Sequence, residues 1–157
     1  MHIERLKTLR DVIAATPDEA VNMGTWRCDP GGWAKDPAKP ECGTIACMLG
    51  WACMVPEFQA AGLKFLAFAN VPEGFRHLDF IPSYEDDISY SAGEAFFELD
   101  PGVGYALFKT AEAGLNQKAV ALGRLDYLLK EGHLGGYFDP QPPADPDDDQ
   151  TWIDDWS

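Results

Sequence analysis

Residues 42–53 read CGTIACMLGWAC: three cysteines, two glycines and an apolar series without one charged side chain. A helix that is hydrophobic on every side is normally buried in the core of a protein. A cysteine at the N-terminus of a helix, in contrast, lies in an electropositive setting that lowers the pKa of its thiol. The segment is therefore either a core helix or a thiol site, and its apolar composition favours the core.

The segment predicts a helix that begins near residues 42–44 and that Pro56 ends after roughly three turns. Small side chains recur three or four residues apart along it, so one of its faces would let a neighbouring helix approach closely. The preceding residues 24–41 contain three glycines and three prolines. They predict a loop, which Trp26 and Trp33 anchor.

Helical periodicity and capping residues predict further short helices on both sides of this segment. Two of them begin with capping boxes, in which a Ser or Thr precedes a Glu by three residues, at Thr16 and at Ser91. Asn116 caps the last helix, and Gly132 ends it. The predicted helices cover residues 3–13, 17–23, 57–61, 91–99, 101–108 and 117–131.

Residues 63–68 fit a strand or a helical turn equally well. A turn signal at Val71–Gly74 would allow residues 75–81 to pair back as a β-hairpin. The fold class predicted from these patterns is mainly α: a compact single domain of roughly five to seven short helices with at most one small hairpin. We expect this domain to span residues 1–137 and an acidic Pro/Asp/Trp tail to span residues 138–157.

The chain has 26 acidic and 12 basic residues among its 157, which gives a net charge of −14. The last basic residue is Lys130, so the tail carries seven aspartates with nothing to offset them. Such a protein repels a phosphate backbone, which argues against direct binding of nucleic acid. The charge favours a protein partner with a basic surface. The sequence leaves the oligomeric state open.

The first fifteen residues mix charged and apolar side chains, unlike the continuous apolar stretch of a secretory signal. The longest run without charge, residues 42–56, is too short to cross a bilayer. We therefore expect a soluble intracellular protein without a membrane partner. In such a compartment the four cysteines are expected to be reduced thiols. They are Cys28, Cys42, Cys47 and Cys53.

The sequence predicts no catalytic, cofactor-binding or metal-binding residue. The cysteines lack the paired spacing of a zinc site, and Glu85–Asp87 lacks the glycine and the spaced ligands of a calcium loop. The glycine loops that bind phosphates are absent. One alternative stays open: a cysteine-dependent enzyme in which Cys42 is the nucleophile and His77 or His133 is the base.

The tail interleaves its aspartates with Trp152, Ile153 and Trp156. A tail that serves solubility alone has little use for two tryptophans. Acidic aromatic segments of this kind dock into basic apolar grooves, either on a partner or on the body of the same chain. Both alternatives remain open. The candidate partner-binding residues are Asp145, Asp147, Asp148, Asp149, Trp152, Asp154, Asp155 and Trp156.

Three segments carry a resemblance to a known family: CGTIACMLGWACMVPEFQAAGLKF at 42–65, AGEAFFELDPGVGYALF at 92–108 and KAVALGRLDYLLKEG at 118–132. Over about residues 22–131 the chain resembles a family of small uncharacterised proteins encoded by tailed phages and prophages. The family's motif is Cys-Gly-Thr-x-x-Cys-x-x-Gly-x-Ala. Here the motif falls on Cys42, Gly43, Thr44, Cys47, Gly50 and Ala52. The acidic tail departs from the family pattern.

The resemblance and the charge together predict a non-enzymatic interaction protein of phage type. It would act in the host cytoplasm, where it binds and modulates a protein of the host or the phage. A nucleic-acid mimic or an inhibitor of host defence would have this charge. The alternatives are a structural or assembly component of the virion, and the Cys42 enzyme.

Overall fold

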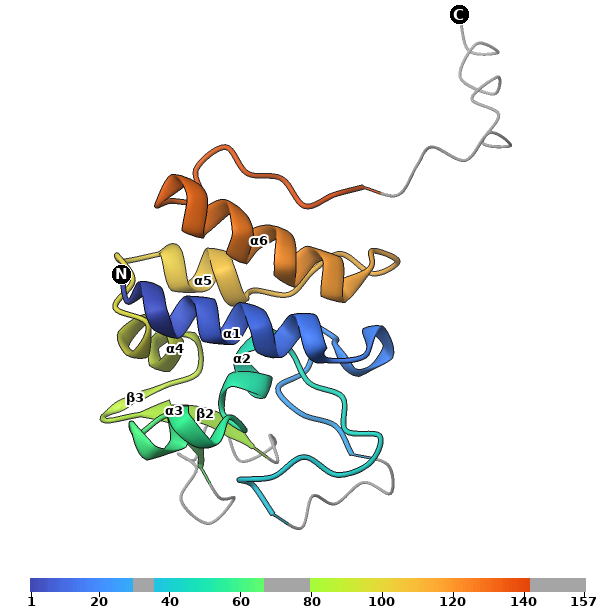
Figure 1. Ribbon diagram of the computed structural model, residues 1–157, viewed down its shortest axis with the longest axis vertical. Helices are drawn as coiled ribbons and strands as arrows, with labels where there is room; N and C mark the ends of the chain where they lie inside the picture. The colour runs from blue at the N-terminus through green and yellow to red at the C-terminus, as the bar shows by residue number, and fades with distance from the viewer. Residues whose placement is uncertain (30–35, 67–79, 142–157) are drawn as a thin grey trace, which may run out of the picture.

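The computed structural model describes residues 1–29, 36–66 and 80–141, which form a mainly α fold with a small β element (Figure 1). The predicted turn Val71–Gly74 and Trp33 lie outside these residues. The described helices are α1 (Ile3–Ala15), the 3₁₀ turn η1 (Asp18–Ala20), α2 (Met48–Ala52), α3 (Pro56–Ala60), α4 (Tyr90–Phe96), α5 (Val103–Phe108) and α6 (Gln117–Glu131). The strands are β1 (Lys64–Leu66), β2 (Ile81–Tyr84) and β3 (Asp87–Ile88).

The two long helices, α1 and α6, lie side by side and run in opposite directions (Figure 1). The apolar stripe predicted for the first helix is buried, with Leu6, Leu9 and Ile13 inside. Two polar contacts fix the pairing along its length. Arg10 binds Asp126 at 2.7 Å, and the amine of Lys118 donates to the carbonyl of Ala14 at 2.9 Å.

The helix predicted to begin near residues 42–44 begins only at Met48, so that part of the prediction is wrong. Instead of coiling, residues 44–47 lie beside the segment 20–28 and exchange backbone hydrogen bonds with it. Cys28 and Ile45 bond each other in both directions, at 2.7 and 2.8 Å. The N–H of Cys47 donates to Thr25 at 2.8 Å. Backbone groups used across this pairing are not available for helical bonds.

Gly50 lies where the short helix α2 meets this segment. A Cβ added to Gly50 would lie 1.9 Å from the carbonyl oxygen of Trp26. The small-residue face predicted around Gly50 therefore admits the backbone of a loop and not a neighbouring helix. Trp26 itself packs its ring 5.0 Å from that of Tyr90, so it anchors the loop as predicted.

The predicted caps of the last helix are confirmed. The side chain of Asn116 accepts from the N–H of Ala119 at 2.9 Å, and Gly132 ends α6 in the left-handed conformation.

The two predicted capping boxes are wrong. The hydroxyl of Thr16 donates back to the carbonyl of Val12 at the end of α1, and only the 3₁₀ turn η1 follows. The helix assigned to Ser91 begins one residue earlier, at Tyr90. Its Glu94 accepts from the N–H groups of Gly102 and Gly104, at 3.0 and 3.1 Å, and so serves the start of α5. A side-chain acceptor that reaches the next helix is not available to its own helix.

The small sheet is antiparallel, in the order β1-β2-β3. Its first strand falls within the predicted residues 63–68 and pairs Phe65 with Pro82. The returning strand begins at Ile81, the last residue of the predicted range, so the prediction is right for one strand and shifted for the other. The third strand, β3, was not predicted, because two residues are too few to show a pattern.

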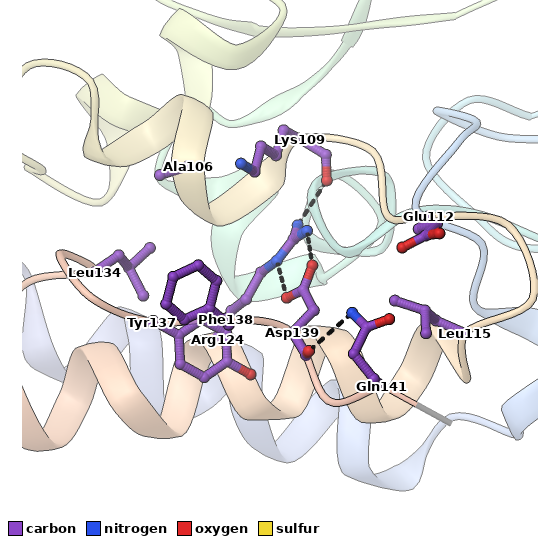
Figure 2. A pocket seen from close by; sticks show the side chains of 10 residues that line it. All are labelled: Ala106, Lys109, Glu112, Leu115, Arg124, Leu134, Tyr137, Phe138, Asp139 and Gln141. Carbon is purple, nitrogen blue, oxygen red and sulfur yellow. Dashed lines mark hydrogen bonds and ion pairs between the residues drawn. The ribbon is translucent and has the colours of Figure 1, made fainter. Parts of the chain in front are cut away.

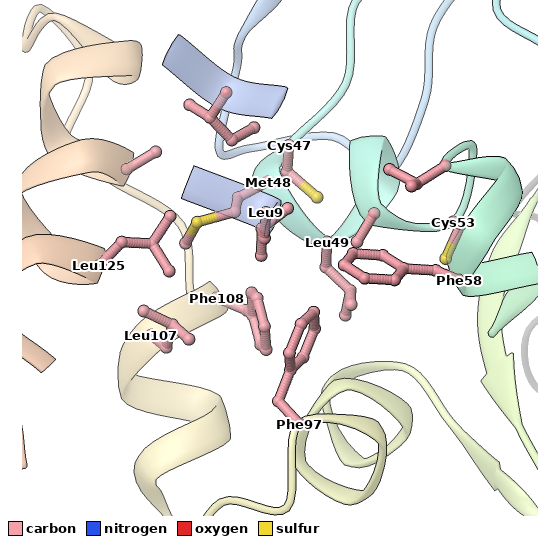
Figure 3. Packing of buried hydrophobic residues seen from close by; sticks show 14 of the residues in the cluster. Leu9, Cys47, Met48, Leu49, Cys53, Phe58, Phe97, Leu107, Phe108 and Leu125 are labelled. Atoms are coloured by element: carbon pink, nitrogen blue, oxygen red, sulfur yellow. The ribbon is translucent and has the colours of Figure 1, made fainter. Parts of the chain in front are cut away.

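The core joins α2, α3, α4 and α5 through a cluster of phenylalanines (Figure 3). The ring of Phe58 lies 5.0 Å from Phe96 and 5.6 Å from Phe97, edge to face in both pairs. Met48 and Leu49 of the central segment are fully buried against it. Full burial of one such side chain contributes about 1.5–3 kcal/mol. The prediction that residues 42–53 supply the core therefore holds for the part that starts at Ala46.

The contact at Gly50 can be tested by the substitution Gly50→Ala. The added methyl group has no space against the backbone of Trp26, so we expect the free energy of unfolding to fall by about 3 kcal/mol. The measurement is urea denaturation followed by circular dichroism. Gly135→Ala is the control, because a Cβ there meets its nearest atom at an ordinary 3.6 Å. Equal denaturation midpoints for the two variants would contradict this account.

Candidate functional site

The four cysteines divide into two classes. Cys47 and Cys53 are buried, whereas Cys28 and Cys42 are exposed. Burial raises the pKa of the Cys47 thiol to about 11, although its sulfur accepts from the N–H of Gly50 as the cap of α2. Burial also raises the pKa of Cys53. Thiols with raised pKa values are poor nucleophiles at neutral pH, so Cys47 and Cys53 contribute to packing.

Cys42 does not lie at the start of a helix, contrary to the reasoning that made it a candidate nucleophile. It occupies a turn before the paired residues 44–47. The candidate base His133 packs beside the ring of Tyr127, with ring centroids 6.0 Å apart, and His77 lies outside the described residues. Within the described part of the chain, no hydrogen bond joins Cys42 to a histidine.

Metal ligands do not gather in the part of the chain that the structure covers, where no group of three His, Cys, Asp or Glu side chains could hold an ion. The acidic run Glu85–Asp87 forms the two-residue turn between β2 and β3 and the start of β3. Its side chains are exposed. A solvated turn accounts for this run.

A buried ion pair holds the loop that leads to the central segment. Arg27 binds Asp29 through two hydrogen bonds, at 2.9 and 3.3 Å, and both side chains are almost fully buried. The same guanidinium donates to the carbonyls of Asp36 and Lys39. The hydroxyl of Thr44 donates to the carboxylate of Asp29 at 2.5 Å. Thr44 of the Cys-Gly-Thr motif therefore has a structural role, as the partner of a buried carboxylate.

A second buried arginine lies on α6. Arg124 is 1 % exposed, and its guanidinium faces the carboxylate of Asp139 with two bonds, at 2.9 and 2.8 Å (Figure 2). The opposite side of the guanidinium donates to the carbonyls of Leu107 and Lys109, at 3.2 and 2.6 Å. Arg124 thus joins α6 to the end of α5 and to the start of the acidic tail.

Sequence reasoning missed this pair, although a signal was present. Arg124 follows Val120 and precedes Leu128 at intervals of four, which places it on the buried stripe of the last helix. A charged residue on such a stripe needs a buried partner. Asp139 was counted among seven tail aspartates with nothing to offset them, but it stands six residues before the next one.

Residues 134–141, which we call the strap, run back along α6 after the turn at Gly132. The hydroxyl of Tyr127 donates to the carbonyl of Gly135 at 3.0 Å, and the rings of Tyr127 and Tyr137 lie 5.0 Å apart. Gly123 makes room for the strap, because a Cβ there would lie 2.3 Å from the hydroxyl oxygen of Tyr137. The beginning of the predicted tail is therefore bound to the body of the protein.

A pocket of about 260 Å³ lies between the strap and α5. Figure 2 shows its wall, with Arg124 and Asp139 paired beside it and the ring of Phe138 on the side of Leu134. Phe138 is 85 % exposed, the largest exposed fraction of any large hydrophobic side chain in the described residues. Ala106, Leu115 and Leu134 also contribute apolar surface to the pocket.

Another pocket, of about 330 Å³, lies between the start of α1 and α3. It includes Arg5, whose guanidinium donates to the carbonyl of Phe96 at 2.7 Å and lies 4.1 Å from the centre of its ring. His2 accepts from the N–H of Arg5 as the cap of α1. His2 and Arg5 of this pocket are thus engaged in holding the N-terminus.

The eight candidate partner-binding residues of the tail lie outside the described residues. They are Asp145, Asp147, Asp148, Asp149, Trp152, Asp154, Asp155 and Trp156. What the structure adds is the place from which they leave the body: the strap, beside α5 and α6, ends at Gln141.

None of the described helices has the length and the apolar composition that a membrane span requires.

Comparison of the chain with protein-family models, with curated proteins and with solved structures finds no match.

The two classes of thiol predict a pattern of alkylation. At pH 8 we expect iodoacetamide to modify Cys28 and Cys42 in the folded protein, and Cys47 and Cys53 only after unfolding. Raising the pH to 9 should not change this, because the pKa of Cys47 is about 11. Peptide mass spectrometry gives the modified positions. Early modification of Cys47 in the native protein would show that the central segment is accessible.

The pair between Arg124 and Asp139 predicts a large loss of stability for Asp139→Asn. The substitution leaves the charge of a buried arginine without its counter-charge, so we expect unfolding to become easier by about 3 kcal/mol. Asp126→Asn, on the helix α6 that also carries Arg124, is the matched control. Its partner Arg10 is well exposed, and loss of such a pair costs about 0–1 kcal/mol. Urea denaturation of both variants gives the comparison, and similar losses would contradict the assignment.

Proposed function

We propose that this chain is a non-enzymatic acidic interaction protein of phage type, which binds and modulates a host or phage protein that has a basic surface. Its net charge of −14 carries the proposal. At this charge it acts as a nucleic-acid mimic or as an inhibitor of host defence, because it occupies a surface that otherwise binds a phosphate backbone. Its place of action is the host cytoplasm.

The arrangement of the basic side chains supports the proposal. Arg27 and Arg124 are buried and paired with aspartates. Arg10 and Lys118 are bound to groups of the neighbouring long helix. These four of the twelve basic side chains are thereby engaged in contacts with other parts of the chain, whereas acidic groups such as Glu85–Asp87 face solvent. The buried pairs leave the net charge of −14 unchanged, but fewer basic groups remain to face a partner.

Several side chains of types that often take part in catalysis have structural roles here, which supports a binding function over a catalytic one. His2 caps a helix, Thr44 binds a buried carboxylate, and Cys47 caps the central helix with a raised pKa. Every buried side-chain nitrogen or oxygen of the described residues has a hydrogen-bond partner within the protein. Groups committed to such contacts serve the fold.

The tail concentrates the charge. Its seven aspartates, without a basic residue, supply half of the net charge in the last twenty residues. Electrostatic attraction between exposed charges extends over a Debye length of about 8 Å at physiological ionic strength, and it weakens as salt is added. A partner recruited in this way is therefore captured quickly and released by salt.

The proposal predicts that neutralising the tail abolishes capture of the partner. Full-length tagged protein is used to recover proteins from phage-infected cells, beside a variant in which the six tail aspartates after Asp139 are replaced by asparagine. We expect the variant to recover the specific partner at least about tenfold less, as loss of several charge pairs implies. Quantitative mass spectrometry of the recovered proteins is the measurement.

The control variant neutralises Glu85, Asp86 and Asp87, which are exposed in the turn between β2 and β3. Its capture should stay near that of the wild type. Added double-stranded DNA should displace the partner if the protein mimics nucleic acid. Equal recovery of the partner by the tail variant and the wild type would remove the tail from the mechanism.

A further inference from the structure

Tyr105 is, after Phe138, the most exposed large hydrophobic side chain of the described residues, at 58 %. It lies on α5, which packs beside α4 (Figure 1). The centre of its ring is 5.3 Å from that of Tyr90 on α4, and the two rings are almost perpendicular, at 88°. Tyr90 in turn packs against Trp26, with the ring centres 5.0 Å apart. Tyr105 is therefore the outer member of a row of three aromatic rings, of which the inner two are half-buried.

The perpendicular packing leaves one face of the Tyr105 ring open. Two perpendicular rings touch edge to face, so Tyr90 covers at most one face of its neighbour. The faces of an aromatic ring carry partial negative charge and attract cations. Among the described residues, the rings that lie under a guanidinium of the same chain are those of Phe80 and Phe96. The open face of Tyr105 is thus left for a cation from outside the chain.

A carboxylate lies beside the same pair of rings. Glu94 follows Tyr90 by four residues on α4, so the two side chains share one face of that helix. One oxygen of Glu94, Oε2, accepts from the N–H groups of both Gly102 and Gly104. A Cβ added to Gly104, the residue before Tyr105, would lie 2.5 Å from the Cβ of Glu94. The carboxylate and the open ring are therefore neighbours where α4 meets α5.

The chain around this junction is acidic. Residues 90–105 contain no lysine or arginine, and their three acidic residues are Glu94, Glu98 and Asp100. The last two of these are exposed. The nearest basic residue along the chain, Lys109, lines the pocket beside the strap (Figure 2). The junction of α4 and α5 therefore combines an exposed aromatic ring with negative charge, and the structure describes each residue that contributes to it.

Arginine is the cation that fits this combination best. Its planar guanidinium stacks on an aromatic face and still directs hydrogens to a carboxylate, whereas the lysine amine is a compact and strongly hydrated charge. The fold already contains such an arrangement, because Arg27 binds Asp29 and also lies 5.2 Å from the centre of the Phe80 ring. Glu94 and Tyr105 present the same two groups at the surface.

We propose that the junction of α4 and α5 is a docking site for an arginine side chain of a protein partner. The guanidinium lies on the open face of Tyr105 and binds Oε1 of Glu94, since both glycine N–H groups donate to Oε2. The exposed carboxylates of Glu98 and Asp100 attract the basic surface around that arginine. This inference rests on the proposed function, for which it names one point of contact.

The probe for this site is a short peptide that alternates arginine with glycine, compared with the same peptide carrying lysine in place of arginine. The two peptides have equal charge, so the net charge of −14 attracts them equally. Each is titrated at low salt into ¹⁵N-labelled full-length protein and followed by NMR. We expect the amide signals of Gly104 and Tyr105 to report binding of the arginine peptide about threefold more tightly than the lysine peptide, as one exposed cation–ring contact implies.

Tyr105→Leu keeps an apolar side chain but removes the ring, so the arginine peptide should lose its threefold advantage. Tyr105→Phe keeps the ring and should bind as the wild type does. Glu94→Gln removes the charge but retains an oxygen for the glycine N–H groups, and it should weaken binding of the arginine peptide at these amides. Phe138→Leu, at the other strongly exposed ring, is the matched control and should leave both titrations unchanged. A full preference for arginine in Tyr105→Leu would overturn the assignment.

Two negative results have different meanings. Binding of both peptides without any shift of the Gly104 and Tyr105 signals, or with equal affinities at these signals, would overturn the docking site and leave the acidic interaction role intact. Failure of both peptides to bind at low salt would overturn the proposed function together with this inference.

Discussion

The guanidinium of Arg124 is the constraint on which the C-terminal half of the structure depends. A cation buried to 1 % exposure is costly unless it is paired and its hydrogens are bonded. Here the end of α5 supplies carbonyl oxygens, and Asp139 supplies the counter-charge. Satisfying this one group holds α5, α6 and the strap together. The strap is held as well by Tyr127, whose hydroxyl donates to the carbonyl of Gly135 and whose ring packs against that of Tyr137.

A similar contact recurs in a second irregular segment of the described residues. Arg27, paired with Asp29, gathers the carbonyls of residues 36–39, and Thr44 completes the carboxylate's bonding. Neither segment contains a long helix or strand that could hold its shape through a regular backbone pattern. In each case a planar guanidinium with several donors replaces that pattern. Arg27 and Arg124 thus hold these irregular segments to the rest of the fold through hydrogen bonds and ion pairs.

The contacts of Arg124 connect the fold to the proposed function. Without the strap, the chain would leave the body at the end of α6. The strap instead brings the chain to the edge of a small pocket, beside an exposed aromatic ring, before the run of aspartates begins. Electrostatic attraction is long in range and poor in specificity, whereas a pocket has short range and defined shape.

The sequence by itself determined the class of the fold, the apolar stripes of α1 and α6, the cap at Asn116 and the net charge, because each depends on composition or on local spacing. The tertiary structure decided where the central helix begins, since residues 44–47 pair with a segment twenty residues away. It also decided the role of Glu94, which caps the next helix, and that of Asp139, which is paired with a buried arginine. These outcomes depend on which distant group lies within hydrogen-bonding distance, and no local pattern contains that information.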